Sequence, residues 1–244
     1  SIRDYAKVLR LGFGGIRREV EDQLGAADAA DPEYPQRENF WGAALEVCDA
    51  GILLGLRYAE RAVALAARAK DAAKRQRLVE MAKACRRVPG EGARTLHEAV
   101  QSLWLAHILT CGEDGINANS IGRLDQILFP YYAADLAAGR TTREQALELM
   151  EELACRLYLE YDVQAITLGG ADAAGADATN ELTHLILEAT GRVEFARDVS
   201  VRLSSQSPPE LVRQSARLIA AGGGIPFLFN DDCFIPALAD HGIA

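Results

Sequence analysis

The sequence lacks several features that would place a protein in a class at once. No segment reaches the ~18 to 20 consecutive apolar residues needed to cross a bilayer. The first ten residues, SIRDYAKVLR, contain no apolar stretch followed by small residues, so they do not resemble a secretory signal. The five cysteines form no CxxC pair and no regular spacing, which indicates reduced thiols. We therefore expect a cytoplasmic protein with no membrane partner.

Acidic residues outnumber basic ones, 35 to 26. The formal net charge is -9, which argues against a nucleic-acid partner. The densest basic stretch, residues 70–87, has helical spacing with apolar residues between the charges, as expected for a solvated helix face rather than a phosphate-binding track.

Common catalytic and metal-binding motifs are missing as well. The four histidines form no HExxH motif, so we expect no metal site. No GxSxG sequence is present, and Cys233 follows two carboxylates, which is a poor setting for a thiolate nucleophile. The glycine-rich stretch CGEDGINANSIGR (111–123) does not fit the spacing of a calcium loop.

The composition that is present, 49% hydrophobic and 25% charged, is that of a globular protein. Residues 1–160 read as mainly helical, with one helix over 4–24 and two more across 39–88. We treat residues 1–244 as a single region, because no repeat or low-complexity linker interrupts them.

Residues 161–244 have a different sequence pattern. Short β-branched or aromatic segments at 163–170, 198–205 and 225–231 alternate with helical patterns at 179–190 and 208–221. This βαβαβ order predicts a parallel sheet with helices packed outside, and hence a helix-rich α/β fold.

Five stretches together resemble the glycyl radical enzyme family, which includes pyruvate formate-lyase and the diol dehydratases. They keep the family's order and spacing across essentially the whole chain. The stretches are FWGAALEVCDAGILLGLRYAERA (40–62), ARTLHEAVQSLWLAHI (93–108), SIGRLDQILFPYYAADLAAGRTTREQALEL (120–149), ITLGGADAAGADATNELTHLILEA (166–189), and SVRLS (200–204) with GGGIPFLFNDD (222–232).

The resemblance implies a fold and an activity. The fold would be part of a ten-stranded α/β barrel of the pyruvate formate-lyase-like domain. The enzyme would be a radical lyase, a dehydratase or a C-acetyltransferase such as formate acetyltransferase, acting on a small organic substrate under anaerobic conditions. No cofactor would be bound. A separate iron–sulfur activase that uses S-adenosylmethionine would install the glycyl radical, and a buried cavity would protect the intermediates.

The sequence also departs from the family. The loop with the thiyl cysteine and the segment with the radical glycine are absent from these 244 residues. We therefore assign no catalytic residue, and expect an internal fragment that is inactive without the remainder of the enzyme chain. Half a barrel would leave strand edges open, so we also expect a homo-oligomer.

The resemblance does indicate substrate-binding residues. Asn117 and Ala118 precede the S-x-GR motif where the family lines its substrate pocket, and Ser120 begins that motif. The alternative for Asn117 is a cap on the loop backbone. We expect Arg123 and Asp125 to form a structural pair or cap, and Asp177 to cap a helix.

Two other functions stay open at this point. The chain could be a non-catalytic, truncated or split relative that serves as an assembly module. It could instead be a phosphate-ligand-binding α/β domain, because GGADAAG (169–175) lies between a predicted strand and a predicted helix.

Overall fold

The computed structural model describes residues 3–114, 119–160, 164–194 and 198–243. The chain divides into two compact units, Asp4–Asp114 and Gly115–Ala244. We call them the helical unit and the sheet unit and describe each by itself.

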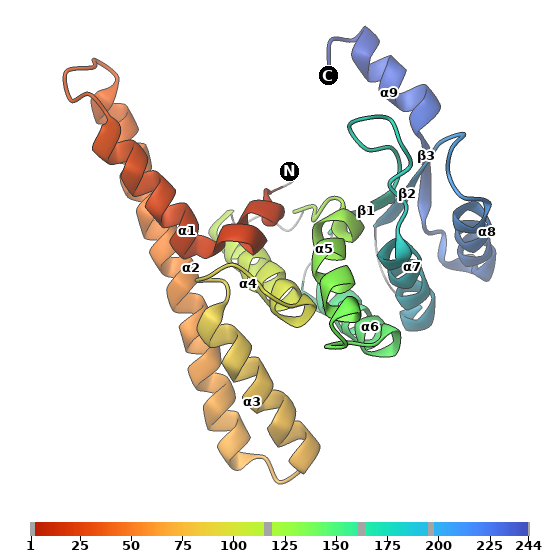
Figure 1. Ribbon diagram of the computed structural model, residues 1–244, viewed down its shortest axis with the longest axis horizontal. Helices are drawn as coiled ribbons and strands as arrows, with labels where there is room; N and C mark the ends of the chain where they lie inside the picture. The colour runs from red at the N-terminus through yellow and green to blue at the C-terminus, as the bar shows by residue number, and fades with distance from the viewer. Residues whose placement is uncertain (1–2, 115–118, 161–163, 195–197, 244) are drawn as a thin grey trace. The chain divides into compact units, whose positions relative to one another are not determined.

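The helical unit consists of long helices joined by short connections (Figure 1). The predicted helices are confirmed, although the second begins at Tyr34 rather than near Asn39, because Pro35 lies in its first turn, where a missing N–H is tolerated. The elements are α1 (Tyr5–Ala26), α2 (Tyr34–Arg68), α3 (Ala72–Arg87) and α4 (Leu96–Asp114).

Helix α1 contains a break at Gly12, whose φ of 66° is non-helical. The loop that follows α3 packs into this break: the N–H of Phe13 donates to the carbonyl of Pro89 (2.7 Å), and that of Gly14 to the carbonyl of Gly90 (2.8 Å). A Cβ on Gly12 would lie 2.4 Å from the backbone carbon of Glu91, so only glycine fits. Gly12 and Gly14 thus mark a docking point for another backbone.

Helices α2 and α3 pack closely because small residues face each other. A Cβ on Gly55 would lie 2.8 Å from the ring of Pro89. Ala59 of α2, Cys85 of α3 and Leu105 of α4 form a buried cluster beneath them. Burial raises the pKa of the Cys85 thiol to about 11, which keeps this cysteine in its neutral, unreactive form.

A buried polar contact joins the two ends of the helical unit's sequence. The hydroxyl of Tyr5 lies 2.7 Å from Nδ1 of His107, and Sγ of Cys111 lies 3.7 Å from Nε2 of the same ring. His107 is therefore a hydrogen-bonded core histidine.

Helix α2 differs from one expectation. Its 35 residues include an 18-residue window with a mean hydropathy of 1.2, so by length and composition it could cross a membrane. Charged residues, including Glu46 and Asp49, interrupt the apolar runs of α2, although its many alanines and leucines raise the mean hydropathy. Only 17% of the window is buried.

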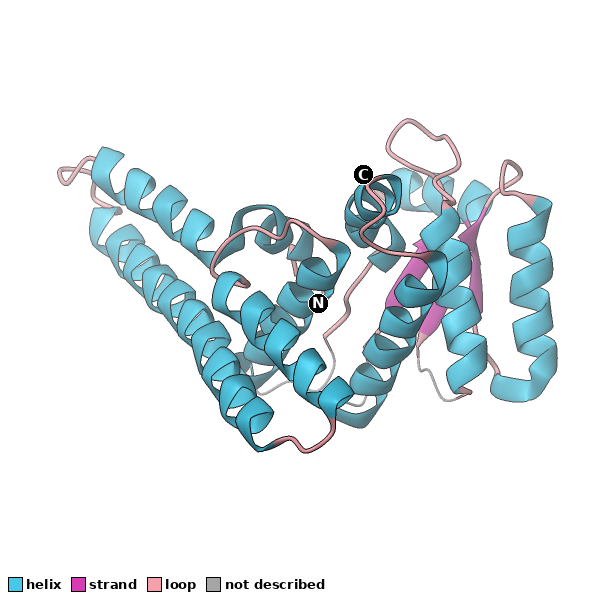
Figure 2. Ribbon diagram, turned by 60° about the horizontal axis from the view of Figure 1, so that its bottom comes forward, coloured by secondary structure: helices cyan, strands magenta, loops and turns pink. Residues whose placement is uncertain are grey.

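The sheet unit has the predicted parallel βαβαβ order, with strands in the sequence β1-β2-β3 and helices alongside them (Figure 2). Ile166 is in register with Val199, and Ser200 with Phe227. The elements are α5 (Leu124–Ala137), α6 (Arg143–Glu160), β1 (Ile166–Gly169), α7 (Glu181–Val193), β2 (Val199–Leu203), α8 (Pro209–Leu218), the π-helix η1 (Ile219–Gly223), β3 (Phe227–Asn230) and α9 (Asp231–Asp240).

The strands become more exposed from β1, at one edge of the sheet, to β3, at the other edge. Strand β1 is mostly buried, whereas all four residues of β3 are exposed. The aromatic rings of Phe227 and Phe229 remain half in solvent, and Phe229 lies beside Phe234 of α9, with ring centroids 6.1 Å apart. Strand β3 is thus an apolar edge of the sheet, and α9, which the sequence did not predict, extends the apolar surface.

Candidate functional site

The end of the stretch 111–123 lies against the first strand of the sheet. The N–H of Ile121 donates to the carbonyl of Ala165 (2.9 Å), and the N–H of Thr167 donates to the carbonyl of Gly122 (2.8 Å). Gly122 and Ile166 form a parallel bridge, so residues 120–122 act as a short extra strand beside β1. Ser120 is half-buried at its start.

The remaining two substrate-binding predictions, Asn117 and Ala118, lie outside the described residues. Of the predicted site, the structure therefore places only Ser120 and the arginine–aspartate pair that follows it.

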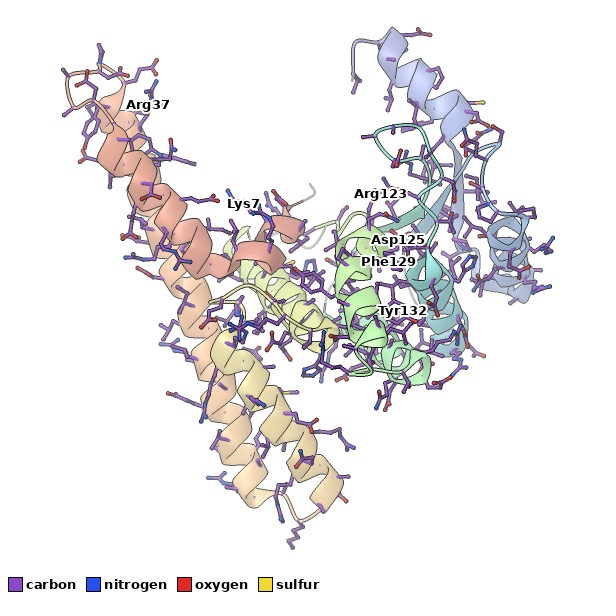
Figure 3. All side chains as sticks on the ribbon, viewed as in Figure 1. Lys7, Arg37, Arg123, Asp125, Phe129 and Tyr132 are labelled. Carbon is purple, nitrogen blue, oxygen red and sulfur yellow. The ribbon has the colours of Figure 1, made fainter. Side chains whose placement is uncertain are left out.

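Arg123 and Asp125 lie at the start of α5, close to the end of β1 (Figure 3). Both bind the backbone of the turn that follows β1. Arg123 donates to the carbonyls of Gly169 (Nη2, 2.6 Å) and Ala171 (Nη1, 3.1 Å). Oδ2 of Asp125 accepts from the N–H of Gly169 (2.8 Å). The predicted structural role is confirmed, but the two side chains act through this shared turn rather than through a direct ion pair.

Asp125 is completely buried, and burial raises the pKa of its carboxyl group. Hydrogen bonds oppose that shift, because the carboxylate also accepts from Oγ1 of Thr183 (2.6 Å) and from the N–H of Gln126 (2.8 Å). With its oxygens engaged by these donors, Asp125 is suited to hold structure rather than to exchange protons with a ligand.

A second buried carboxylate holds the other end of the turn. Asp231, at the first position of α9, accepts from the N–H of Ala171 (2.8 Å). It also forms a bidentate ion pair with Arg202 of β2, at 2.8 and 2.9 Å. Gly170 lies directly on this pair: a Cβ there would be 2.6 Å from Cβ of Arg202 and 2.8 Å from Oδ2 of Asp231. The turn is thus fixed from two sides at the carboxyl end of the sheet.

The rest of the loop is closed by its own carboxylates. Oδ1 of Asp172 accepts from the N–H groups of Ala174 (2.8 Å) and Ala176 (3.0 Å). Asp177 accepts from Thr179 (3.1 Å), and its predicted role as a helix cap is wrong. Asn180 caps α7 instead, in a capping box with Thr183, because the helix begins one full turn after Asp177.

These contacts argue against a phosphate site at GGADAAG. A phosphate loop needs free backbone N–H groups that point at the ligand. Here the N–H groups of Ala171, Ala174 and Ala176 already donate to aspartates. The carboxylates of Asp172 and Asp231 therefore occupy the positions in which a bound phosphate would accept these hydrogen bonds. Within the described ranges, no group of three His, Cys, Asp or Glu side chains could hold a metal ion.

Comparison with known proteins identifies the family. The model of the pyruvate formate lyase-like family matches residues 1–244. The chain belongs to this family. Its α/β fold with a small parallel sheet is that of glycyl radical enzymes of known structure. The TM-score to the 1,2-propanediol-dehydrating protein of Roseburia inulinivorans is 0.94, and the sequence identity is 32%. The match covers 99% of this chain and 32% of the Roseburia protein. The family resemblance is confirmed.

Two further relatives are enzymes. Isethionate sulfite-lyase of Nitratidesulfovibrio vulgaris is 35% identical over 99% of this chain. The glycerol-bound form of the B12-independent glycerol dehydratase from Clostridium butyricum has a TM-score of 0.93, with 34% identity over 99% of this chain. The match covers 31% of the lyase and 32% of the dehydratase, so the chain spans about a third of the length of these family members.

Sequence reasoning missed Asp231 and Thr183 as parts of this site. Asp231 is 60 residues from Ala171, and Thr183 is 58 residues from Asp125. No local pattern signals contacts at such separations. The sequence did place Asp231 directly after a predicted strand. Polar side chains often lie together at the carboxyl ends of parallel strands, so this position was a hint.

Proposed function

We propose that this chain forms part of a glycyl radical lyase or dehydratase that acts on a small organic substrate. The supporting observation is the match of the whole chain to a family whose similar members include a sulfite-lyase and two diol or triol dehydratases. In this proposal the thiyl cysteine and the radical glycine belong to segments that complete the enzyme, and the 244 residues alone are inactive. An acetyl-transferring activity like that of formate acetyltransferase is a narrower possibility within the same proposal.

The proposed setting follows from the chemistry. A glycyl radical would be installed by a separate iron–sulfur activase that uses S-adenosylmethionine, and it would require anaerobic conditions in the cytoplasm. The cysteines agree with a reducing compartment, because none of the five forms a disulfide.

We also propose that the three parallel strands belong to a ten-stranded barrel. The open edge of β3 supports this, since its four residues are exposed and three of them are large and apolar. A further strand beside β3 would pair its backbone and cover these side chains.

The proposed contribution of this chain to substrate binding is the loop before α5. Asn117 and Ala118 would face the substrate, and Ser120 would anchor the loop where it joins β1. The network of Arg123, Asp125 and Asp231 would keep the adjoining turn rigid, so that the loop departs from a fixed base.

A chimera tests the proposal. Residues 1–244 replace the matching third of the Clostridium butyricum glycerol dehydratase, which is then treated anaerobically with its activase. We expect a glycyl doublet in the EPR spectrum of the chimera and none from the 244-residue chain alone. In the chimera, Asn117→Ala should raise KM with little change in the EPR signal, whereas Asp125→Asn should lower the amount of folded protein. A folded chimera without turnover of any diol, triol or sulfonate substrate would favour the non-catalytic assembly module.

A further inference from the structure

A buried tyrosine, histidine and cysteine form a hydrogen-bonded series inside the helical unit. The hydroxyl of Tyr5 lies 2.7 Å from Nδ1 of His107, and Nε2 of the same ring lies 3.7 Å from Sγ of Cys111. The three residues are 1%, 0% and 4% exposed. Each side chain can give up or pass on a proton, and the phenol and the thiol can also lose an electron. The proposed substrate-binding loop uses none of them.

The helices place these groups in order. His107 and Cys111 are four residues apart in α4, so their side chains are neighbours on one face of the helix. Tyr5 comes from the first turn of α1. One turn before His107 lies Trp104, whose ring centroid is 6.2 Å from that of His107. Trp104 is only half-buried, so an oxidisable indole that reaches solvent lies next to the buried series.

We propose that Tyr5, His107 and Cys111 form a relay that carries a hydrogen atom from the Tyr5 hydroxyl to a thiyl radical at Cys111. A thiyl radical lacks one electron and one proton relative to the thiol. The electron passes from the phenol of Tyr5 to sulfur. The phenol proton passes to Nδ1 of His107, and the proton on Nε2 passes to sulfur. The products are the Cys111 thiol, the other tautomer of the imidazole, and a neutral phenoxyl radical on Tyr5.

Burial explains why the imidazole is needed. Oxidation of Tyr5 with its proton still in place would leave a buried cation, which is costly. Nδ1 of His107 can take the proton, but a histidine that only accepted it would become a buried cation in turn. Release of the Nε2 proton to sulfur keeps every group neutral. Both tautomers of His107 satisfy the contacts to Tyr5 and Cys111, so the relay begins and ends in a hydrogen-bonded arrangement.

The inference rests on the proposed function only for the origin of the radical. A glycyl radical lyase or dehydratase works through sulfur- and carbon-centred radicals. Such a radical, by taking the thiol hydrogen of Cys111, would be reduced and would leave the thiyl radical behind. The relay then moves the oxidation from sulfur to Tyr5. This protects Cys111 from conversion to sulfinic and sulfonic acids, which is irreversible for most proteins.

The first test oxidises the 244-residue chain with azide radicals, generated by γ-irradiation, and maps the products by peptide mass spectrometry. Tyr5→Phe removes only the hydroxyl, and we expect it to raise the oxidation of Cys111 to sulfur oxyacids about fivefold or more. Tyr34→Phe is the matched control, because the hydroxyl of Tyr34 donates to Glu38 (3.3 Å) and not to an imidazole. It should leave Cys111 as in wild type. Equal oxidation of Cys111 in wild type and Tyr5→Phe would overturn the relay.

The second test follows the radical by EPR after freezing the irradiated chain. We expect a phenoxyl signal that Tyr5→Phe largely removes and Tyr34→Phe preserves. His107→Gln keeps a side chain that can hydrogen-bond but cannot pass a proton through, so it should lose the Tyr5 signal and raise the oxidation of Cys111. Circular dichroism checks that this variant is folded. A phenoxyl signal that survives Tyr5→Phe undiminished would overturn the inference.

A solvent isotope effect on the wild-type chain tests the proton steps without any substitution in the core. Formation of the Tyr5 phenoxyl radical should slow about twofold or more in D2O, because two protons move with the electron. An unchanged rate would overturn the role of His107. None of these measurements uses a substrate or an activase. Their failure would therefore leave the proposed lyase or dehydratase standing, and an inactive chimera would leave the relay standing.

Discussion

The carboxylate of Asp125 accepts a hydrogen bond from the N–H of Gly169, 44 residues further along the chain, at 2.8 Å. This contact joins the first turn of α5 to the end of β1. Because the same carboxylate binds Thr183 at the start of α7, one buried side chain fixes the relative positions of two helices and a strand. Its ionisation state should therefore be visible in the stability of the fold.

Asp125→Asn should lower the free energy of unfolding by about 1–3 kcal/mol, because the carboxamide cannot accept all the hydrogen bonds that the carboxylate accepts. The pKa of Asp125 is raised in the folded state by burial. When the pKa of a carboxyl group is higher in the folded state than in the unfolded state, protonation stabilises the folded protein. This contribution is complete at pH values below the pKa of the unfolded state, and it is lost as the pH rises through the pKa of the folded state. The difference between wild type and Asp125→Asn should therefore grow as the pH is lowered from 7 toward 4. Urea unfolding at several pH values measures it; a difference that shrinks on acidification would contradict the raised pKa.

Gly170→Ala should be strongly destabilising, by about 2–4 kcal/mol. Gly170 has a φ of +81°, which costs an alanine about 1–2 kcal/mol, and the new Cβ would overlap the pair of Arg202 and Asp231. Gly175→Ala provides a matched control, since Gly175 has the same φ but nothing within 4 Å of the added carbon. Thermal unfolding of both variants should show a clearly larger loss at Gly170; equal losses would mean that the ion pair moves aside.

Asp231→Asn should cost about 2–3 kcal/mol, because it leaves the guanidinium of Arg202 without its anionic partner and weakens the bond to Ala171. Arg202→Met combined with Asp231→Asn should lose less than the sum of the two single variants, since the unpaired charge is then removed. A double-mutant cycle from denaturant unfolding gives the coupling; strict additivity would show that the ion pair contributes nothing.

The five cysteines should differ widely in reactivity. Cys233 is exposed, whereas Cys85 is buried and its pKa is raised to about 11. At pH 8 only about 0.1% of Cys85 is thiolate even where reagent can reach it. Mass spectrometry after brief alkylation of the native chain should therefore find Cys233 labelled first and Cys85 unlabelled. Rapid labelling of Cys85 would show that α2 and α3 separate under native conditions.

The sequence predicted the parts of the fold that depend on local pattern. The parallel strands and their connecting helices follow from alternation of β-branched segments with helical periodicity, and the structure confirms their order. The sequence did not predict α9, because the strand-like residues of β3 are followed directly by Asp231. The local signal for a helix there is the side chain of Asn230, which accepts a hydrogen bond from the N–H of Asp232.

The site was less accessible to sequence reasoning. The role of Arg123 and Asp125 as structural residues follows from the family segment, but their partner, the backbone of Gly169–Ala171, depends on how β1 and α5 meet. The sequence predicted Asp177 as the cap of α7, whereas the structure has Asn180 in that position. Both residue types are good helix caps, so only the geometry of the preceding loop decides between them.

The break at Gly12 has a consequence for the order in which the helical unit can assemble. Residues before the break include Tyr5, which bonds to His107 of α4, and residues after it include Phe13, whose ring contacts Gly51 of α2. The backbone groups exposed by the break receive their partners only when the loop around Pro89 and Gly90 arrives. We therefore expect the two halves of α1 to form as separate helical segments, which the loop after α3 joins by accepting from the N–H groups of Phe13 and Gly14.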